Sequence, residues 1–249
     1  MTNPPPDAPD AQDAPLEFYL TADTPCPYLP NLRERRILTF LETPPQTRAL
    51  PLLLQSGFRR SQNMLYRPHC ASCKACKSVR LRLGDFTPDT AERRILRKNK
   101  HLTAAHGAAL SSPALYDLFS RYQLSRHADG GMAGMTESDL RAMIEEHTGH
   151  ARLMTAADGT GRIVCAMLYD DMPDGVSAVY SFFDPALSAQ SLGTWMIVTL
   201  ATWVQAQGKD YLYLGYWIAA SRKMAYKARF QPLEILLENG WTDFSTASI

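Results

Sequence analysis

The second half of the chain contains the pattern that most constrains its fold, a series of short strand-like segments followed by one long helical segment. Residues 151–156, 162–169 and 176–183 read as strands, and Asp158-Gly159 and Pro173-Asp174-Gly175 are turn signals between them. Asp184-Pro185 ends the third strand. A helix is predicted over 191–207, because Gly208 follows it as a suitable C-cap. This order predicts adjacent antiparallel strands and a helix that returns the chain to their sheet.

The remaining segments after residue 101 complete one α/β unit. Helices are predicted at 113–127 and 136–148, the second with Thr136 and Asp139 in a capping arrangement. A strand at 211–215, a short basic helix at 221–228 and a strand at 233–237 follow the long helix. This is the layout of an acetyltransferase-like (GNAT-type) domain, which we expect to occupy residues 102–249.

Residues 16–101 are predicted to form a smaller mixed α+β domain that carries cysteines. Segments 36–41 and 78–83 alternate as half-buried strands do, and Thr87-Pro88 opens a helix that runs to about Lys100. Residues 1–15 are rich in Pro and Asp and are predicted to be a disordered tail. They lack the features of a signal peptide, and no apolar run is long enough to span a membrane, so we expect a cytoplasmic protein with reduced cysteines.

The charge of the chain is unevenly distributed. The formal net charge is only +1, yet the segment from Arg59 to His101 holds twelve Lys or Arg residues and three acidic residues. Such a block favours a polyanionic partner. The alternative is a solvated surface on which the cations pair with acids from elsewhere in the chain.

Four cysteines form the candidate metal site. Cys70, Cys73 and Cys76 are spaced three apart, and Cys26 lies far upstream. Thiolates at this spacing can converge on zinc or on an iron–sulfur cluster. The alternative is a basic loop packed by reduced thiols, and Cys165 is expected in the core.

Two further segments have the composition of nucleic-acid contacts. Gln190, Ser191 and Gly193 stand where the long helix begins, and exposed helix N–H groups favour anions such as phosphate. The turn resembles the Gln/Arg-x-x-Gly-x-Gly/Ala pattern that holds coenzyme A in acetyltransferases, but Trp195 stands at its last position. The alternative is an ordinary helix start.

The second segment combines aromatic rings with cations. Candidate contacts to an RNA end are Tyr213, Tyr216, Arg222, Lys223 and Lys227. Alternating aromatics on a strand also suit a core, so each face of the strand could serve a different purpose.

Longer strings connect these segments to one family. CPYLPNLRERR, YRPHCASCKACKSVRLRL, SFFDPALSAQSLGTWMI and YLYLGYWIAASRKMAYKARFQPLE resemble the arginyl-tRNA–protein transferases, in their bacterial branch of aspartate/glutamate leucyltransferases. The resemblance extends over residues 16–237. It implies transfer of leucine from Leu-tRNA to proteins that begin with Asp or Glu, a step of the N-degron pathway of protein degradation. Eukaryotic relatives have a Cys-x-x-Cys pair near the N-terminus, where this chain has Cys26 and Leu29.

The implied reaction makes limited chemical demands. An aminoacyl-tRNA ester is already activated, so neither ATP nor a catalytic cofactor is required, and positioning and oxyanion stabilisation remain. Candidate catalytic residues are Tyr180, Ser181 and Asp184, with Asp184 as acceptor of the amine proton or, alternatively, as a turn residue. An acidic substrate side chain calls for arginine, and the candidates are Arg33, Arg36 and Arg80.

Other functions stay open at this point. Arginine in place of leucine is one alternative, because the choice of leucine rests on the branch resemblance. An acetyl-coenzyme A-dependent N-acetyltransferase would use the same turn at Gln190. A non-catalytic RNA-binding or zinc-bearing regulator would account for the basic cysteine region, but it would leave the acetyltransferase-like half unexplained.

Overall fold

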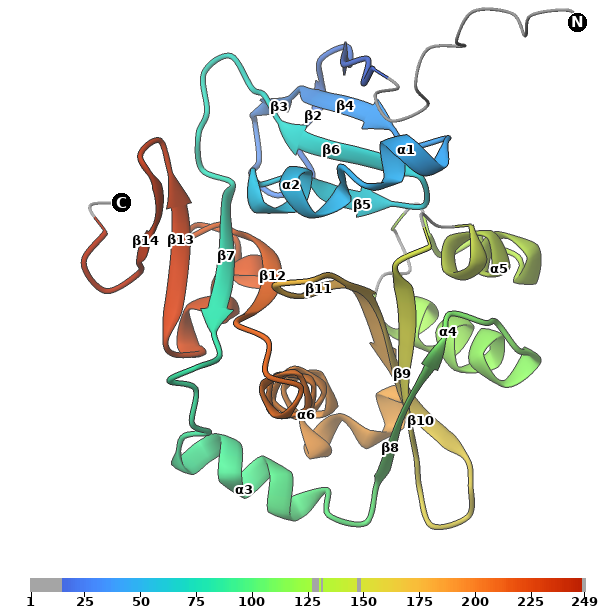
Figure 1. Ribbon diagram of the computed structural model, residues 1–249. Helices are drawn as coiled ribbons and strands as arrows, with labels where there is room; N and C mark the ends of the chain where they lie inside the picture. Colours follow the sequence, from blue (N-terminus) through green and yellow to red (C-terminus); the bar gives the residue numbers. More distant parts are fainter. Residues whose placement is uncertain (1–14, 127–129, 131, 147–148, 248–249) are drawn as a thin grey trace, which may run out of the picture.

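The computed structural model describes residues 15–126, 130, 132–146 and 149–247, so residues 1–14 of the predicted tail lie outside it. An eight-stranded sheet forms the centre of the molecule (Figure 1). Its strands, in spatial order, are β14 (Gly240–Asp243), β13 (Leu233–Leu237), β7 (Lys77–Arg82), β12 (Tyr211–Trp217), β11 (Gly175–Phe183), β10 (Ile163–Asp171), β9 (Ala151–Ala157) and β8 (Thr103–Ala108). All neighbours are antiparallel except β11 and β12.

The parallel pair β11 and β12 is joined only at one end. Gly175–Ser177 pair with Tyr211–Tyr213, and no pairing continues beyond them. A Cβ atom at Gly175 would lie 2.2 Å from the Tyr211 carbonyl oxygen, so the contact of the two strands requires glycine there. The 3-10 turn η1 (Pro185–Gln190) and the helix α6 (Leu192–Ala206) connect the two strands. The predicted acetyltransferase-like α/β class is confirmed by this layout.

Helices cover both faces of the large sheet. The helix α6 packs on one face, and α3 (Thr90–Lys98) packs on α6. On the other face lie α4 (Pro113–Arg126) and α5 (Glu137–Glu145), which begins after the predicted cap at Thr136. Because each helix buries an apolar side against the sheet, the hydrophobic core has one part under α6 and another under α4 and α5.

A smaller four-stranded sheet lies above the large sheet in Figure 1. Its strands, in spatial order, are β1 (Tyr19–Leu20), β4 (Arg36–Phe40), β6 (Met64–Pro68) and β5 (Arg59–Ser61), and it is accompanied by α1 (Pro44–Thr47), α2 (Leu50–Gln55) and the pair β2 (Thr24–Pro25) and β3 (Arg33–Glu34). The side chains of Arg60 and Asp170 connect the two sheets through an ion pair in which both are 0% exposed. A third part of the core, which includes Leu65 and Tyr213, fills the space between the sheets.

Most predicted elements are present, and the differences concern the domain division, one helix and several short elements. The strand β7 belongs to the large sheet, so the sheets divide the chain before Lys77, whereas the sequence suggested a division after His101. The predicted helix 221–228 is instead a short helix α7 (Arg222–Ala225) followed by a 3-10 turn η2 (Tyr226–Arg229). Strands β8 and β14 and helices α1 and α2 were not predicted, and the short strands β1, β2, β3, β5 and β6 were not located individually. Among the described residues, every helix is too short or too polar to cross a bilayer.

Candidate active site

The separation of β11 from β12 opens a cavity of about 570 Å³, which we call the cleft. Residues of β11, β12 and α6 line it on the side of the large sheet, and β5, β6 and the segment Pro27–Tyr28 line it on the side of the small one. The cleft has three cationic side chains, Arg59, Lys223 and Lys227, and no Asp or Glu among its described lining residues. Its tyrosines are Tyr28, Tyr66, Tyr180, Tyr216 and Tyr226. This composition suits an anionic, partly planar ligand.

Arg59 extends from β5 into the cleft. Its guanidinium group donates to Ser177 Oγ, at 3.1 Å, and to the carbonyl oxygen of Ala178. Ala178 lies just beyond Ser177, the last residue of β11 that pairs with β12. Arg59 therefore supplies a hydrogen-bond donor where the two strands have separated. Gly215 of β12 lies against the same guanidinium group: its φ is +78°, and a Cβ atom there would come within 2.8 Å of Arg59 Cζ. Glycine at 215 therefore makes room for Arg59.

Lys227 enters the cleft from η2. It is only 7% exposed, and its Nζ donates to the carbonyl oxygen of Tyr216 at 2.6 Å. Burial, and then the charge of Arg59, lower the pKa of Lys227 to about 7. A phosphate contact was expected for Lys227, and its burial argues against that role.

Two of the three predicted catalytic residues line the cleft. Tyr180 and Ser181 both lie on β11, and Tyr180 Oη accepts a hydrogen bond of 2.6 Å from Gln123 Nε2. Burial raises the pKa of Tyr180 to about 12, so its phenol keeps its proton at neutral pH. Tyr180 is therefore placed to donate a hydrogen bond into the cleft.

Asp184, the third predicted catalytic residue, has a structural role. It caps η1 by accepting from the Ala186 amide at 3.0 Å, and it pairs with Arg162 and Arg121 at 2.7 and 3.0 Å. Burial opposes ionisation, but the bonds from Arg121, the Ala186 amide and Arg162 outweigh it and lower the pKa of Asp184. These contacts correct the prediction that Asp184 accepts the amine proton and support its reading as a turn residue.

The start of α6 lies beside basic side chains. Ser191 is left-handed, with φ of 54°, and Gly193 would place a Cβ atom at an ordinary 3.5 Å from Phe183. Arg229 of η2 donates to Thr194 Oγ1, and the Gln190 carbonyl oxygen accepts from Asn99 Nδ2 at 2.9 Å. The predicted anion site at Gln190, Ser191 and Gly193 is therefore flanked by η2 on one side and by the end of α3 on the other.

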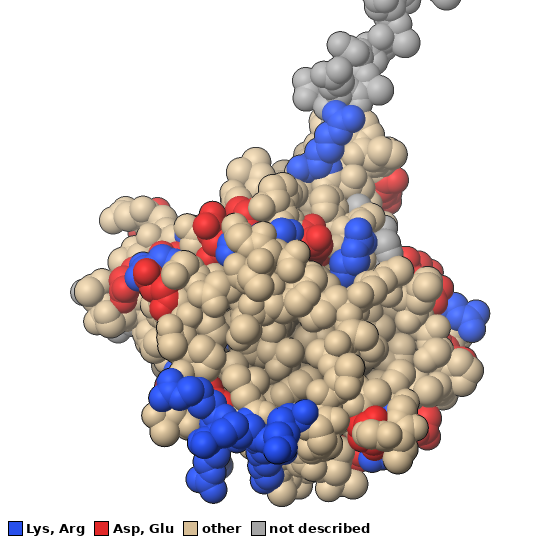
Figure 2. All heavy atoms as spheres, turned by 60° about the horizontal axis from the view of Figure 1, so that its bottom comes forward, with Lys and Arg blue, Asp and Glu red and all other residues tan. Residues whose placement is uncertain are grey.

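The basic block of the sequence divides into paired and unpaired cations. Arg60, Arg80, Arg82 and Lys74 form ion pairs with acids distant in sequence or with Asp85. On α3, by contrast, and just after it, five cations are all exposed and take part in none of the ion pairs found among the described residues: Arg93, Arg94, Arg97 and Lys98 on the helix and Lys100 beyond its end. Figure 2 shows Lys and Arg side chains gathered over this helix. The paired part of the block is thus explained by the fold, and the exposed cations of the α3 region are the part to which the prediction of a polyanionic partner still applies.

The arginines predicted to recognise an acidic substrate are engaged elsewhere. Arg33 donates to the Asp23 carbonyl oxygen at 2.5 Å, and Arg36 pairs with Glu34 at 2.5 Å. Arg80 is 8% exposed and pairs with Glu234 at 2.7 Å. Its guanidinium carbon lies 3.5 Å from the ring centre of Tyr211 and 4.3 Å from that of Trp241. Arg59, which the sequence did not single out, is the arginine in the cleft.

The predicted RNA-contacting residues also divide into two groups. Tyr213 is buried between the sheets, where its hydroxyl donates to Asp174 at 2.7 Å and accepts from Arg80 at 3.1 Å, so it belongs to the core. The ring of Tyr216 lines the cleft, and its hydroxyl lies 3.0 Å from the Gly57 carbonyl oxygen. Arg222 and Lys223 are exposed on α7, and Lys223 lines the cleft.

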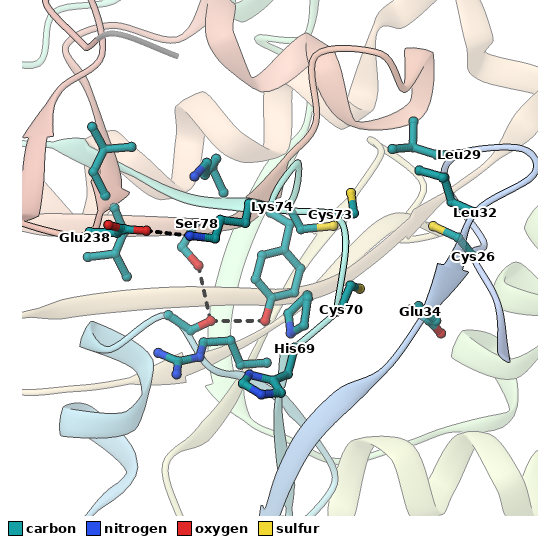
Figure 3. A pocket seen from close by; sticks show the side chains of 18 of the residues that line it. Cys26, Leu29, Leu32, Glu34, His69, Cys70, Cys73, Lys74, Ser78 and Glu238 are labelled. Carbon is teal, nitrogen blue, oxygen red and sulfur yellow. Dashed lines mark hydrogen bonds and ion pairs between the residues drawn. The ribbon is translucent and has the colours of Figure 1, made fainter. Parts of the chain in front are cut away.

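The four predicted metal ligands line a second cavity, of about 560 Å³, between the small sheet and β13. Cys26 comes from one wall and Cys70, Cys73 and Cys76 from another, with His69 beside them (Figure 3). Burial, and then the charges of the other three cysteines, raise the pKa of Cys76 to about 12. Although the thiols share a cavity, no three His, Cys, Asp or Glu side chains of the described residues are arranged to hold one metal ion.

Comparison with known proteins gives consistent matches over most of the chain. The family model "Arginine-tRNA-protein transferase, N terminus" matches residues 24–94, and its C-terminal counterpart matches residues 114–237. The "Aspartate/glutamate leucyltransferase" of Gluconacetobacter diazotrophicus is 45% identical over 228 residues, which cover 92% of this chain and 88% of the relative. The protein of the same name from Rhizobium meliloti is 43% identical over 247 residues, or 95% of each chain.

Solved structures resemble the chain at much lower identity. L-PGS from Bacillus licheniformis is 12% identical with a TM-score of 0.48, and the match covers 73% of this chain and 65% of that one. FemX is 10% identical with a TM-score of 0.43, over 73% of this chain and 63% of FemX.

Proposed function

The chain belongs to the arginine-tRNA-protein transferase family and is an aminoacyltransferase, and we propose that it transfers leucine from Leu-tRNA to the N-terminal amine of proteins that begin with Asp or Glu. Its substrates are an aminoacyl-tRNA and a protein. The names of the relatives support leucine and the acidic N-termini. We further place the reaction in the cytoplasmic N-degron pathway.

The observation that carries this proposal is the composition of the cleft: three cations and five tyrosines line it, without a carboxylate among its described lining residues. An aminoacylated RNA end brings phosphates and a flat base, and the acceptor protein brings an acidic side chain. Arg59 and Lys223 can bind the anionic groups of the two substrates, and tyrosine rings can stack on the base. The cleft can therefore hold both substrates with the ester and the amine side by side.

Arg59 is our candidate for recognition of the acidic side chain. A guanidinium group has five N–H donors, of which Arg59 uses two on Ser177 and Ala178. No hydrogen bond from its other donors is found among the described residues, so they can take a carboxylate, which arginine can bind through two hydrogen bonds. Because these two contacts fix the guanidinium group, little side-chain freedom is lost on binding.

Tyr180 and Ser181 are our candidates for stabilising the developing oxyanion. Attack by the amine turns the ester carbonyl into a tetrahedral centre with a negatively charged oxygen. The protonated hydroxyl of Tyr180, held by Gln123, and the hydroxyl of Ser181 are donors on the same strand. In this proposal all of the chemistry is performed by side chains and the substrate amine.

The tRNA is proposed to approach along α3. Lys98 Nζ donates to the Ala189 carbonyl oxygen at 2.6 Å, which connects the exposed cations of α3 to η1 and the start of α6. From there Arg229 contacts α6 through Thr194, and the exposed Lys223 lines the cleft. The cations thus form a path from an exposed helix to the proposed site of reaction.

Removing two charges from this path is expected to weaken tRNA binding. In the double variant Arg94→Gln/Arg97→Gln, affinity for Leu-tRNA should fall about tenfold at moderate salt, because each lost phosphate contact removes a counterion-release contribution. The slope of log affinity against log salt concentration should become shallower by about 1.5. Fluorescence anisotropy over a salt series measures both quantities.

The matched control is Arg48→Gln/Arg141→Gln, which removes two exposed arginines away from α3, one just after α1 and one on α5. We expect its salt slope to equal that of the wild type. Equal slopes for both double variants would show that α3 does not contact the tRNA.

The reaction itself is tested with radiolabelled aminoacyl-tRNA and peptides that begin with Asp, Glu or Ala. We expect label from Leu-tRNA on the Asp and Glu peptides only, and none from Arg-tRNA. Transfer of arginine would replace leucine in the proposal. Transfer from acetyl-coenzyme A instead of either tRNA would contradict the proposal altogether.

Metal removal is expected to leave transfer unchanged, because every proposed step uses the cleft and none uses the cysteine cavity. The protein would be treated with a chelator under anaerobic conditions, analysed for iron, sulfide and zinc, and assayed with Leu-tRNA. A zinc ion or iron–sulfur cluster at Cys26, Cys70, Cys73 and Cys76 remains a separate proposal. Loss of transfer on chelation, with recovery when the metal is restored, would make it a required part of the enzyme.

A further inference from the structure

Lys227 is a buried amine for which the ion pairs of the described residues provide no acidic partner. Buried lysines usually pair with a carboxylate, because an unpaired charge is costly in a protein interior. Here the buried amine is placed instead in a cavity that accepts substrates. This arrangement is costly for the fold, which suggests that the amine has a function.

The backbone around Lys227 holds it in place. Because β11 and β12 pair only near their starts, the later carbonyl groups on the cleft side of these strands need donors from elsewhere. Arg59 donates a hydrogen bond to the carbonyl oxygen of Ala178, and Lys227 donates one to the carbonyl oxygen of Tyr216. A neutral primary amine has two N–H groups and one lone pair, so the bond to Tyr216 leaves the lone pair free to accept a proton.

The groups around Lys227 disfavour its protonated form. Arg59 from β5 and Lys223 from α7 are the other cations of the cleft, and the remaining titratable side chains there are Tyr28, Tyr66, Tyr180, Tyr216 and Tyr226. Burial and the charge of Arg59 thus act in the same direction, and the pKa of about 7 leaves a large neutral fraction at physiological pH.

We propose that Lys227 is the proton acceptor of the transfer reaction, taking a proton from the α-ammonium group of the acceptor protein. This inference rests on the proposed function. The neutral α-amine then attacks the ester carbonyl carbon, the new C–N bond forms, and the C–O bond to the terminal ribose breaks. The α-nitrogen loses its second proton in this step, and the proton held by Lys227 passes to the departing ribose oxygen. The products are the extended protein, the deacylated tRNA and one released proton.

The other candidates in this region are less suited to the role. Asp184 is held by Arg121 and Arg162, and Tyr180 keeps its own proton. Lys223 is exposed on α7, where water solvates its charge. Lys227 alone among these four residues combines burial with a place in the cleft and with a bond that orients its amine.

The test measures single-turnover transfer from enzyme saturated with Leu-tRNA to a peptide beginning with Asp. For Lys227→Met we expect a rate about 10²- to 10⁴-fold below wild type, the usual contribution of a general base. Binding of Leu-tRNA, measured separately, should change less than threefold. A variant rate within threefold of wild type would overturn the proposal.

The pH dependence separates proton transfer from a structural role. The wild-type rate should rise with pH and level off above about 7, following Lys227. In Lys227→Met the rise should shift to the acceptor amine's own pKa, about 7.7 to 8.0. If Lys227 only supported the fold, the variant would be slower at every pH with an unchanged profile, and the proposal would fail.

Chemical rescue provides a second, independent readout. Lys227→Ala leaves space for a small primary amine, and added amines should restore transfer at rates that increase with amine basicity at constant free-base concentration. Rescue that ignores basicity would contradict the proposal, as would a lack of rescue in a folded variant that binds Leu-tRNA. If the wild type itself failed to transfer leucine, the proposed function would fail first.

Discussion

Replacing Arg59 by methionine is expected to lower kcat/KM about 10²- to 10³-fold for acceptor peptides that begin with Asp. The substrate carboxylate would then enter the cleft without its bidentate partner, and an unpaired buried charge costs about 2 to 5 kcal/mol. Methionine keeps much of the volume of the arginine stem. The measurement is the initial rate of leucine transfer at several peptide concentrations with saturating Leu-tRNA.

The ratio of rates for peptides beginning with Asp and with Asn shows whether Arg59 reads the charge. The wild type should prefer Asp strongly, and Arg59→Met should treat the two peptides nearly alike. Arg33→Met is the comparison variant, since Arg33 is bonded to the Asp23 carbonyl group outside the cleft. An unchanged ratio in Arg59→Met would mean that Arg59 only supports the separated strands. If Arg33→Met lost the preference for Asp over Asn, Arg33 would be the residue that recognises the acidic side chain, as predicted from the sequence.

Replacing Asp170 by alanine is expected to lower the free energy of unfolding by about 3 to 5 kcal/mol. Asp170 and Arg60 are both 0% exposed, and Arg60 Nε lies 2.8 and 2.7 Å from the two carboxylate oxygens. Without Asp170, the guanidinium charge would remain buried between the two sheets, and the Gln62 carbonyl oxygen would be its only remaining hydrogen-bond partner among the residues that the structure describes. Such a charge is far more costly than the loss of one hydrogen bond.

Urea unfolding at neutral pH measures this effect, and Glu238→Ala is the matched control. Glu238 pairs with Lys74 at 2.7 Å, but the two side chains are 81% and 80% exposed, so the loss should be far smaller than in Asp170→Ala. A loss below 1 kcal/mol in Asp170→Ala would show that the buried pair does not hold the sheets together. We also expect Arg60→Met/Asp170→Leu to be more stable than Asp170→Ala, because it leaves no buried charge.

Local patterns in the sequence were sufficient to predict the elements on the large-sheet side of the cleft, but not β5 and β6 on its other side. Strands β9 to β11 and helix α6 are bounded by turn and capping residues that act within a few positions. The strand β8 has the sequence TAAHGA, which is poor in β-branched residues, and its strand form depends on pairing with β9. The position of β7 in the large sheet likewise depends on partners more than a hundred residues away, β12 and β13.

The site was predictable only in part, because some of its residues are positioned by contacts between segments that are distant in the sequence. Tyr180, Ser181, Tyr216, Lys223 and Lys227 share the cleft because they lie on elements whose order could be read from the sequence. Arg59 and Arg60 are adjacent and chemically identical, yet one faces the cleft and the other binds Asp170. Only the packing of β5 against the large sheet distinguishes them. Arg80 similarly pairs with Glu234, a partner that no local pattern reveals.

The location of the aminoacyl end is the central claim, and photo-crosslinking tests it most directly. Leu-tRNA carrying an azide on the base of its terminal adenosine would be irradiated with the wild-type enzyme, and the modified peptides would be identified by mass spectrometry. We predict adducts on cleft residues such as Tyr28, Tyr66 and Tyr226. Adducts confined to the cysteine cavity, around Cys70 and Lys74, would contradict it.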